Sequence, residues 1–546
     1  MEEVSGTRRA VAAGGGRMTR RELLTALGFG VGAAVVVDGC AFPPPEPDPP
    51  KPPPGVPDPL PFPDGVMAGD PATGGAVIWT RVETGGAADA PVLWTVAEDP
   101  GFTQIAAGGL VVATSARGHM VHVPIEGLLP DRWYHYRFEA AGPDGHQVAS
   151  RTGRLRTSPS PGSSPGHLRF AFGSCQQLND SWFVAHRAAA AEPGLDFFMH
   201  LGDYVYVSDT STLTLDDYRA AYRRWRRQPM LRELHAAVPT VAVWDDGELY
   251  NGFDASGDPQ RIAAGTRAWF ESFPVLDAGG GSPHRRFSWG DLADLFVLDV
   301  RSRRDPNAAG DLHAGDSEAD DLGRTTLGTE QYTWLADGLA ASGTAWRLIG
   351  SGYNVAPWRL LNLEFLRPFR PDLPPNAGFY APSEGWDDYM AERRQLLEHL
   401  LRQDVHDTVF ASAHTHIALV AELQPDYDSP TSPVAAFDFC SPAMTADPDP
   451  RRAFLGDLPL PVAEAVLRGA EQWVLGQNRP YLRHMNLVDT GYTVVDVTPD
   501  AVEVTIRLID TFDPDAEPFD GARFRVRRGA GRIEVLPTAT RRGSFG

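Results

Sequence analysis

The chain has 546 residues, of which 42% are hydrophobic and 22% are charged, so it has the composition of a globular protein and enough length for more than one domain. The formal net charge of −22 argues against a nucleic-acid-binding surface, which is usually basic. An anionic substrate would therefore need a local positive field from metal ions or arginine. Three cysteines, Cys40, Cys175 and Cys440, exclude a disulfide framework and leave open one bridge between Cys175 and Cys440.

The first segment, residues 1–41, has the pattern of a twin-arginine export signal. Arg20 and Arg21 precede a Gly/Ala-rich apolar run, residues 23–37, that is too short for a good membrane span. The run ends in VDGC, which is similar to a lipoprotein cleavage box around Cys40. Two outcomes are open, namely lipidation of Cys40 with membrane anchoring, or ordinary cleavage nearby. Both predict an exported protein that is extracellular, periplasmic or bound to the cell surface.

A proline-dense stretch, residues 42–64, predicts an extended spacer that packs no core. Residues 65–157 then contain short stretches rich in β-branched and aromatic residues, separated by Gly, Pro and Asp turns. The clearest alternation is Trp133–Phe138, and residues 131–136 (DRWYHY) resemble a strand common in fibronectin type III-like domains. We therefore predict a small all-β domain, a fibronectin III/Ig-like sandwich, over residues 65–157.

After a second linker, residues 158–166, strands alternate with helices. The predicted strands are Leu168–Phe172, Asp196–Leu201, Thr240–Trp244, Leu292–Leu298, Trp346–Gly350 and Thr408–Ser412. The predicted helices are Asp216–Leu234, Gln331–Ser342 and Trp386–Arg402. Near the end, Tyr492–Val497 and Ala501–Arg507 indicate an antiparallel hairpin. The alternation predicts a large α/β domain over residues 167–525, followed by a tail, residues 526–546.

Polar clusters follow three of the predicted strands, in Phe170–Cys175, Phe197–Tyr206 and Val409–His416. Open α/β sheets place their sites at the carboxyl ends of buried strands. A thiolate from Cys175, the Asp203 carboxylate and a phenolate from Tyr206 are metal ligands of different softness. Each also has an ordinary structural reading, as a small core residue, a helix cap and a packed ring. Together they favour a centre that holds two metal ions and a phosphate.

Two further patterns support a metal centre. Asp245 and Asp246 follow a predicted strand, and a cation would relieve the repulsion between them, although a solvated turn is the alternative. His414 and His416 are spaced so that, on a strand, both rings would lie on one side.

The segment LDVRSRR ends another predicted strand and offers Arg301 and Arg304 as phosphate contacts. Surface salt bridging is the alternative role for these arginines, and also for Arg393 and Arg394 on the predicted helix that begins at Trp386.

Taken in order, FAFGSCQ, HLGDYVY, WDDGE, LDVRSRR, GWDDYMAER, the His-x-His strand and GYTVVDV resemble the PhoD-like alkaline phosphatases and phosphodiesterases of the metallophosphatase superfamily. The resemblance implies a four-layer α/β/β/α sandwich around two mixed sheets, preceded by the small all-β domain. It also implies a secreted, monomeric, metal-dependent hydrolase of phosphate esters. By similarity, Cys175, Asp203 and Tyr206 would hold Fe(III), and Asp203 and Asn251 would share Ca²⁺. Asp246 falls where metallophosphatases carry a metal-binding Asn, so we expect it to be a ligand too.

The chain departs from the family pattern at two positions. Gly247 stands where the family usually has a histidine that would contact the phosphate or the leaving group. His414 stands where the family usually has a ligand aspartate, whereas His416 is kept. Because a nitrogen ligand weakens calcium binding, the second metal is expected to be Ca²⁺ or a transition metal such as Zn, Mn or Fe.

The predicted function is hydrolysis of a phosphate monoester or diester by a metal-activated water, with Asp246, Arg301 and Arg304 in catalytic roles. One alternative is a catalytically degenerate binding module that keeps the fold and the metal but lacks the histidine at position 247. Another is a surface scaffold whose all-β domain binds protein or glycan partners. The sequence leaves the substrate open among phospholipids, nucleotides, teichoic acids and simple organic phosphates.

Overall fold

The computed structural model describes residues 58–538 apart from residues 87, 179–180, 208–210, 276–280, 309, 311, 314–316, 382–383 and 447–459. The predicted export signal, Cys40 with its cleavage box, and most of the predicted spacer lie outside the described residues. Within residues 58–538, less these gaps, no helix combines the length and the hydrophobicity of a membrane span.

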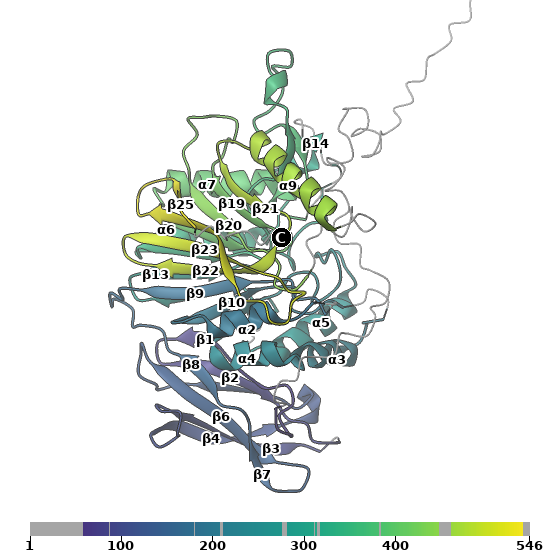
Figure 1. The fold of residues 1–546 in the computed structure, drawn as a ribbon, viewed down its shortest axis with the longest axis vertical. Coiled ribbons are helices and arrows are strands. Elements are labelled where there is room, and N and C mark those ends of the chain that lie inside the picture. The colour runs from purple at the N-terminus through teal and green to yellow at the C-terminus, as the bar shows by residue number, and fades with distance from the viewer. Residues whose placement is uncertain are drawn as a thin grey trace, which may run out of the picture.

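Two mixed β-sheets stacked face to face form the centre of the molecule (Figure 1). The first sheet contains, in spatial order, β25 (Ile533–Leu536), β24 (Phe519–Arg527), β23 (Ala501–Ile509), β22 (Thr490–Val497), β9 (Leu168–Gly173), β10 (Phe197–Leu201), β11 (Thr240–Val243), β1 (Val66–Ala72), β2 (Gly75–Arg81) and β5 (Met120–Ile125). The second contains β12 (Arg285–Trp289), β13 (Ala293–Val297), β15 (Trp346–Gly350), β18 (Thr408–Ser412), β20 (Ala436–Cys440), β19 (Ala418–Leu423) and β21 (Leu482–Asn486).

The central strands of both sheets are parallel and read as continuous apolar runs. In the first sheet β9, β10 and β11 are parallel, and in the second β13, β15, β18 and β20 are parallel. Phe172 and Met199 of the first sheet share one buried cluster with Leu348 and Val409 of the second. Strands covered on both faces need no polar alternation, which is why the sequence shows none here.

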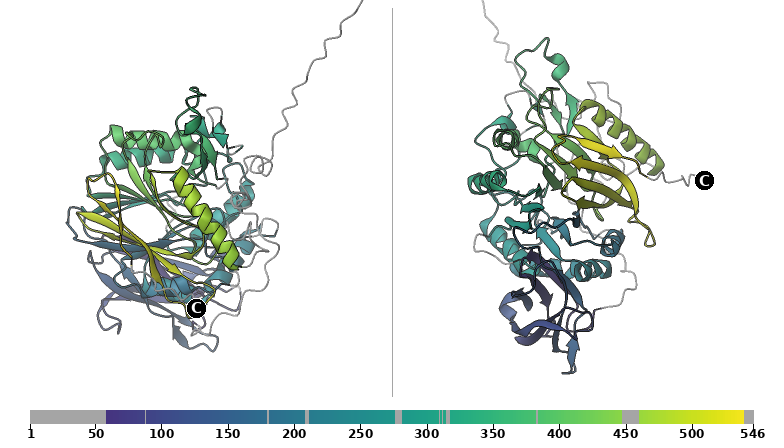
Figure 2. Two further views of the ribbon diagram at one scale, coloured as in Figure 1. Left: turned by 45° about the horizontal axis from the view of Figure 1, so that its top comes forward. Right: turned by 90° about the vertical axis from the view of Figure 1, so that its left-hand side faces the viewer.

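Helices cover the outer face of each sheet. The helices on the first sheet are α2 (Val184–Ala191), α3 (Leu215–Arg226), α4 (Pro229–Ala237) and α5 (Pro259–Ser272), and those on the second are α6 (Gly328–Ala341) and α7 (Met390–Arg402). A further helix, α9 (Leu460–Gln477), packs against β21 and against β16 (Arg359–Asn362). The layers can be followed from two further sides in Figure 2. The predicted four-layer α/β/β/α sandwich is confirmed.

The amino-terminal β region shares a sheet with the rest of the molecule. Its five-stranded sheet contains β4 (Ile105–Ala113), β3 (Ala90–Ala97), β6 (Trp133–Ala141) and β7 (Gln147–Ala149), with β8 (Gly153–Arg156) paired to β6. This sheet packs on β1, β2 and β5, with Ile78, Val123 and Tyr136 buried between them. Because β1 pairs in parallel with β11, the predicted sandwich is a continuation of the first central sheet. A small sheet of β14 (Leu312–His313), β17 (Gly378–Tyr380) and β16 lies near α9.

Three sequence-based boundaries differ from the structure. The end of the predicted spacer is packed, since Phe62 is fully buried and Asp58 pairs with Arg151 and Arg232 at 2.5 Å each. The single helix predicted over residues 216–234 is two helices, because Pro229 has no amide to continue the first and instead begins the second. The predicted tail boundary at residue 526 falls inside β24, and β25 continues the sheet beyond it.

Candidate metal centre

Four strands end at the same place in the fold. Cys175 follows β9, Asp203 follows β10, Asp245 and Asp246 follow β11, and the two histidines follow β18 of the facing sheet. Parallel strands bring their carboxyl ends to one edge of a sheet, so residues far apart in the chain meet there.

Two groups of possible ligands form at this edge. The ligand atoms of Cys175, Asp203 and His416 lie within 4.8 Å of one another, as do those of Asp203, Asp245, Asp246 and His414. Asp203 belongs to both groups, and every member is buried. A carboxylate shared by two ligand groups is the arrangement that a dinuclear centre requires.

The first group has a phenol at its side. The Cys175 thiol lies 3.3 Å from Oδ2 of Asp203, and the Tyr206 hydroxyl donates to the same oxygen at 3.1 Å. The Tyr206 oxygen also lies 3.1 Å from Nε2 of His416. Burial, with help from the Asp203 charge, raises the pKa of the Cys175 thiol well above its ordinary value. A bound cation would offset that penalty and favour the thiolate.

The second group is centred on His414. Its Nδ1 lies 2.6 Å from Oδ2 of Asp245, 3.8 Å from Oδ2 of Asp203 and 4.0 Å from Oδ1 of Asp246. Burial raises the pKa of Asp246 to about 7, an effect that Arg301 opposes and the neighbouring carboxylates reinforce.

The backbone at these positions is unusual. Cys175, Asp203, His414 and His416 all have positive φ angles, of 59°, 54°, 76° and 54°. Left-handed conformations are costly for residues with a side chain, and they gather at functional sites. They also correct the sequence argument for the histidines. Because β18 ends at Ser412, both rings reach the site from a tight turn and not by strand alternation.

Two glycines permit close approach of these turns. A Cβ on Gly202 would lie 2.5 Å from the amide nitrogen of Asp245, and one on Gly247 would lie 2.7 Å from Oδ1 of Asp203. The Gly247 amide donates to that same oxygen at 3.0 Å. The space that a side chain at position 247 would enter is therefore occupied by the Asp203 carboxylate and the Val205 carbonyl.

Glu248 fixes the turns and belongs to neither ligand group. Its carboxylate accepts from the amides of Asp203 (3.0 Å), Tyr204 (2.8 Å) and Asp245 (2.9 Å). One buried side chain thus ties the turn after β10 to the turn after β11.

The two candidate arginines are fully buried beside the second group. Arg301 pairs with Asp245 and Glu384, and its Nη2 lies 3.8 Å from Oδ1 of Asp246. Arg304 donates to the Gly252 carbonyl at 2.9 Å and pairs with Glu384 at 3.2 Å. The alternative of surface salt bridging does not fit these two side chains, because neither reaches the surface.

Asn251 lies half-buried in the turn that follows Asp246. The next residue, Gly252, donates its amide to Oδ2 of Asp246 at 2.7 Å, so Asn251 is placed next to the second group.

The sequence pointed to Asp245 through the Asp-Asp pair, but only Asp246 was assigned as a ligand. In the structure Asp245 contacts His414 directly. Glu248 and Glu384 were missed, because neither gave a signal of its own in the sequence.

The cysteine bridge left open by the sequence is absent, since Cys175 and Cys440 are both free thiols. Asp387, in the GWDDYMAER segment, has a structural role, because it pairs with the buried Arg393 at 2.6 Å.

The residues present fit bound metal ions. Arg301 is surrounded by the carboxylates of Asp245, Asp246 and Glu384, so negative charge exceeds positive charge where an anion would have to bind. Further positive charge is needed to hold a phosphate in such a field. The donor set, with a thiol, a phenol, imidazoles and carboxylates, suits metal coordination.

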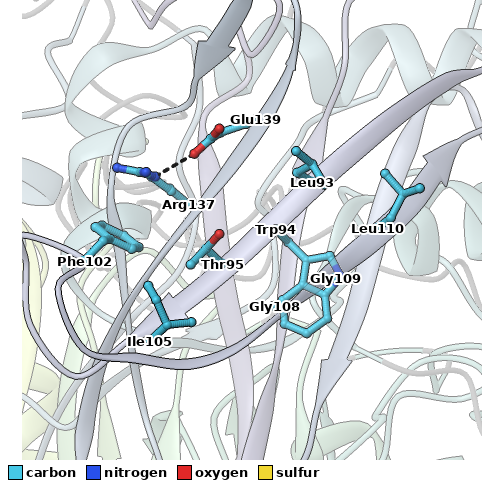
Figure 3. Close-up of a pocket in the computed structure, with 10 residues that line it drawn as sticks. All are labelled: Leu93, Trp94, Thr95, Phe102, Ile105, Gly108, Gly109, Leu110, Arg137 and Glu139. Atoms are coloured by element: carbon cyan, nitrogen blue, oxygen red, sulfur yellow. Dashed lines mark hydrogen bonds and ion pairs between the residues drawn. The ribbon is translucent and has the colours of Figure 1, made fainter.

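A hollow of about 540 Å³ lies in the amino-terminal β region (Figure 3). Its ten lining residues include no cysteine or histidine, and its charged pair, Arg137 and Glu139, is already joined at 3.0 Å. Within the described part of the chain, the two groups of possible metal ligands are therefore at the strand ends and not in this hollow.

Two stacked mixed sheets with a shared aspartate at their strand ends define a hydrolase of the metallophosphatase fold. The chain belongs to the PhoD-like phosphatase family: the family model matches residues 170–506, and the model of the family's N-terminal domain matches residues 51–159. Alkaline phosphatase D of Bacillus subtilis (strain 168) is 31% identical over 425 residues, which cover 71% of this chain and 70% of that protein.

Solved structures agree with this assignment. A structure of PhoD is 27% identical, with a TM-score of 0.76, and covers 89% of this chain and 94% of its own. The purple acid phosphatase PPD1 from yellow lupin seeds is 12% identical, with a TM-score of 0.52 over 86% of this chain and 75% of its own, and shows the shared fold.

Proposed function

We propose that this chain is an exported, metal-dependent phosphoesterase that hydrolyses phosphate monoesters, phosphate diesters or both. The observation that carries the proposal is the sharing of Asp203 by two buried ligand groups, Cys175 with His416 and Asp245 with Asp246 and His414. Membership of a phosphatase family supports phosphate esters as the substrate class. Export rests on the twin-arginine pattern of residues 1–41.

We assign the metal ligands by combining the family resemblance with these contacts. Cys175, Asp203 and Tyr206, with His416 beside them, would hold Fe(III), for which thiolate and phenolate are suitable ligands. Asp203, Asp245, Asp246 and His414, with Asn251 nearby, would hold a second ion, calcium or a transition metal. When bound, the two ions would offset the charge of the substrate and provide a water of lowered pKa as the nucleophile.

The protein's own residues hold and orient the substrate. Arg301 and Arg304 are the donors that would meet phosphate oxygens beside the second group, since guanidinium groups bind phosphate in a fixed geometry. Asp246, as a ligand of the second ion, would hold that ion beside the Arg301 guanidinium. Position 247 is a glycine packed against the Asp203 carboxylate and the Val205 carbonyl, so leaving-group protonation by a histidine at this position is not part of the proposal.

Activity assays on the purified, metal-loaded protein test the proposal. We expect turnover of p-nitrophenyl phosphate, bis(p-nitrophenyl) phosphate or both, loss of turnover after chelation, and recovery when metal is returned. Tight metal binding without turnover of either ester would instead support the catalytically degenerate binding module.

A further inference from the structure

Glu384 occupies the space between the two candidate phosphate-binding arginines. It lies in the segment between β17 and the 3-10 turn Trp386–Tyr389, and its side chain is 14% exposed. A single oxygen, Oε2, pairs with Nη1 of Arg301 and with Nη2 of Arg304, the latter at 3.2 Å. One carboxylate oxygen thus takes the position in which an anionic phosphate oxygen would be bound by both side chains.

The other carboxylate oxygen holds the side chain in place. Oε1 of Glu384 accepts from Nδ2 of Asn307 at 3.2 Å. It also lies against the Gly252 turn, where a Cβ on Gly252 would be 3.1 Å away. The amide of Gly252 donates to Asp246, so one turn separates Glu384 from the second ligand group. Burial alone would raise the pKa of Glu384, but Arg301 and Arg304 hold it at about 2, so the carboxylate is charged at neutral pH.

A fixed negative charge at this point discriminates between substrates by their charge. A phosphate monoester is mostly a dianion at alkaline pH, whereas a diester is a monoanion. The repulsion from Glu384 is therefore larger for the monoester, and in a buried site such differences are only weakly screened. Glu384 also competes with the extra monoester oxygen for Arg301 and Arg304.

We infer that Glu384 is a specificity-determining residue that favours phosphate diesters over monoesters at this site. The inference rests on the proposed phosphoesterase function and assigns it a preference. If Glu384 instead only positions the two arginines, its loss would lower the rates of hydrolysis of both ester classes together.

The test compares Glu384→Gln with the wild type in the metal-loaded protein. The variant keeps the shape of the side chain and removes its charge. We expect the ratio of kcat/KM for p-nitrophenyl phosphate to that for bis(p-nitrophenyl) phosphate to rise roughly tenfold. Glu384→Asp keeps the charge, so its ratio should stay near that of the wild type even where both rates fall.

Asp428→Asn is the matched control. Asp428 is also a buried carboxylate between two arginines, Arg359 at 2.6 Å and Arg367 at 3.8 Å. It accepts hydrogen bonds from Asn362 and Asn376, which belong to neither ligand group. Its loss should leave the ester ratio unchanged. Thermal melting of each variant checks that the protein is folded.

A ratio that stays constant or falls in Glu384→Gln, with both rates reduced, would overturn the inference while leaving the phosphoesterase function intact. If the wild type hydrolyses neither ester, the proposed function fails. In that case, calorimetric titration with inorganic phosphate still tests the role of Glu384. Tighter phosphate binding by Glu384→Gln than by the wild type supports a charge-based selection, and equal or weaker binding contradicts it.

Discussion

Nδ1 of His414 lies 2.6 Å from Oδ2 of Asp245, at the position where related phosphatases are expected to place an oxygen ligand. An imidazole at this point weakens the preference for calcium, which favours oxygen donors, and strengthens that for zinc or manganese. We expect His414→Asp to shift the metal bound at the second group toward calcium, by at least about tenfold in relative affinity. Metal analysis of protein purified without chelators measures the shift.

His406→Asp is the control for this exchange, because the His406 ring is exposed and pairs with Asp404, which belongs to neither ligand group. Its metal content should match that of the wild type. Stoichiometric calcium in the unmutated protein would contradict the argument from His414.

Tyr206 provides a spectroscopic prediction. Its hydroxyl donates to Asp203 and lies beside His416, so an Fe(III) ion held there would have a phenolate ligand. The iron-loaded protein should show a visible tyrosinate-to-iron charge-transfer band, and Tyr206→Phe should lose it while remaining folded. Absorption spectra of the purified proteins measure this directly.

Tyr204 offers a neighbouring control of the same residue type. Its hydroxyl lies 2.9 Å from Nε2 of His235, which belongs to neither ligand group. Tyr204→Phe should keep the band. Loss of the band in both variants, or in neither, would show that Tyr206 is not the iron ligand.

Any side chain at position 247 should lower the stability of the protein. A Cβ there would lie 2.7 Å both from Oδ1 of Asp203 and from the Val205 carbonyl, and the carbonyl cannot swing aside as a flexible side chain would. We expect Gly247→Ala to lower stability by about 1–3 kcal/mol and to weaken metal binding. Gly247→His, which restores the residue usual in the family, should be at least as harmful.

The comparison for this position is Gly343→Ala, where an added Cβ meets no atom within 4 Å. Calorimetry and metal titration of the two alanine variants should separate them clearly. A stable Gly247→Ala variant with normal metal affinity would mean that the two turns can move apart at little cost.

The central strands were predictable because their signal is local. Leu168–Gly173, Trp346–Gly350 and Thr408–Ser412 are short apolar runs bounded by turn residues, and the structure places them within a residue of the sequence-based limits. The signal for the helix break, Pro229, was equally local. It was overlooked because the helical pattern continues on both sides of the proline.

The site was only partly predictable, because contacts between distant turns leave no periodic trace in a sequence. Cys175 and Asp203 were singled out because each follows a buried strand. Glu384 was missed because it contacts Arg301, which lies 83 positions away in the chain, and nothing in the local sequence indicates that contact. The histidine pair was singled out by an argument from strand alternation, whereas in the structure both histidines have left-handed backbone conformations.

Asp438 predicts how stability depends on pH. This fully buried carboxylate on β20 accepts from the hydroxyl of Ser412 (2.6 Å) and from the amides of Val355 (2.9 Å) and Ala356 (2.8 Å). Burial outweighs these hydrogen bonds and raises its pKa from an ordinary value of 3.8 to about 6.

Because the folded pKa is the higher one, the contribution of Asp438 to stability is complete below about pH 4 and is lost as the pH rises toward 6. Asparagine cannot titrate. As the pH rises over this range, the free energy of unfolding of Asp438→Asn should therefore increase relative to that of the wild type, by about 1–3 kcal/mol. Denaturant unfolding of both proteins at pH 4, 5, 6 and 7 measures the gain. A difference that is constant across this range would mean that the Ser412, Val355 and Ala356 donors keep Asp438 ionised throughout.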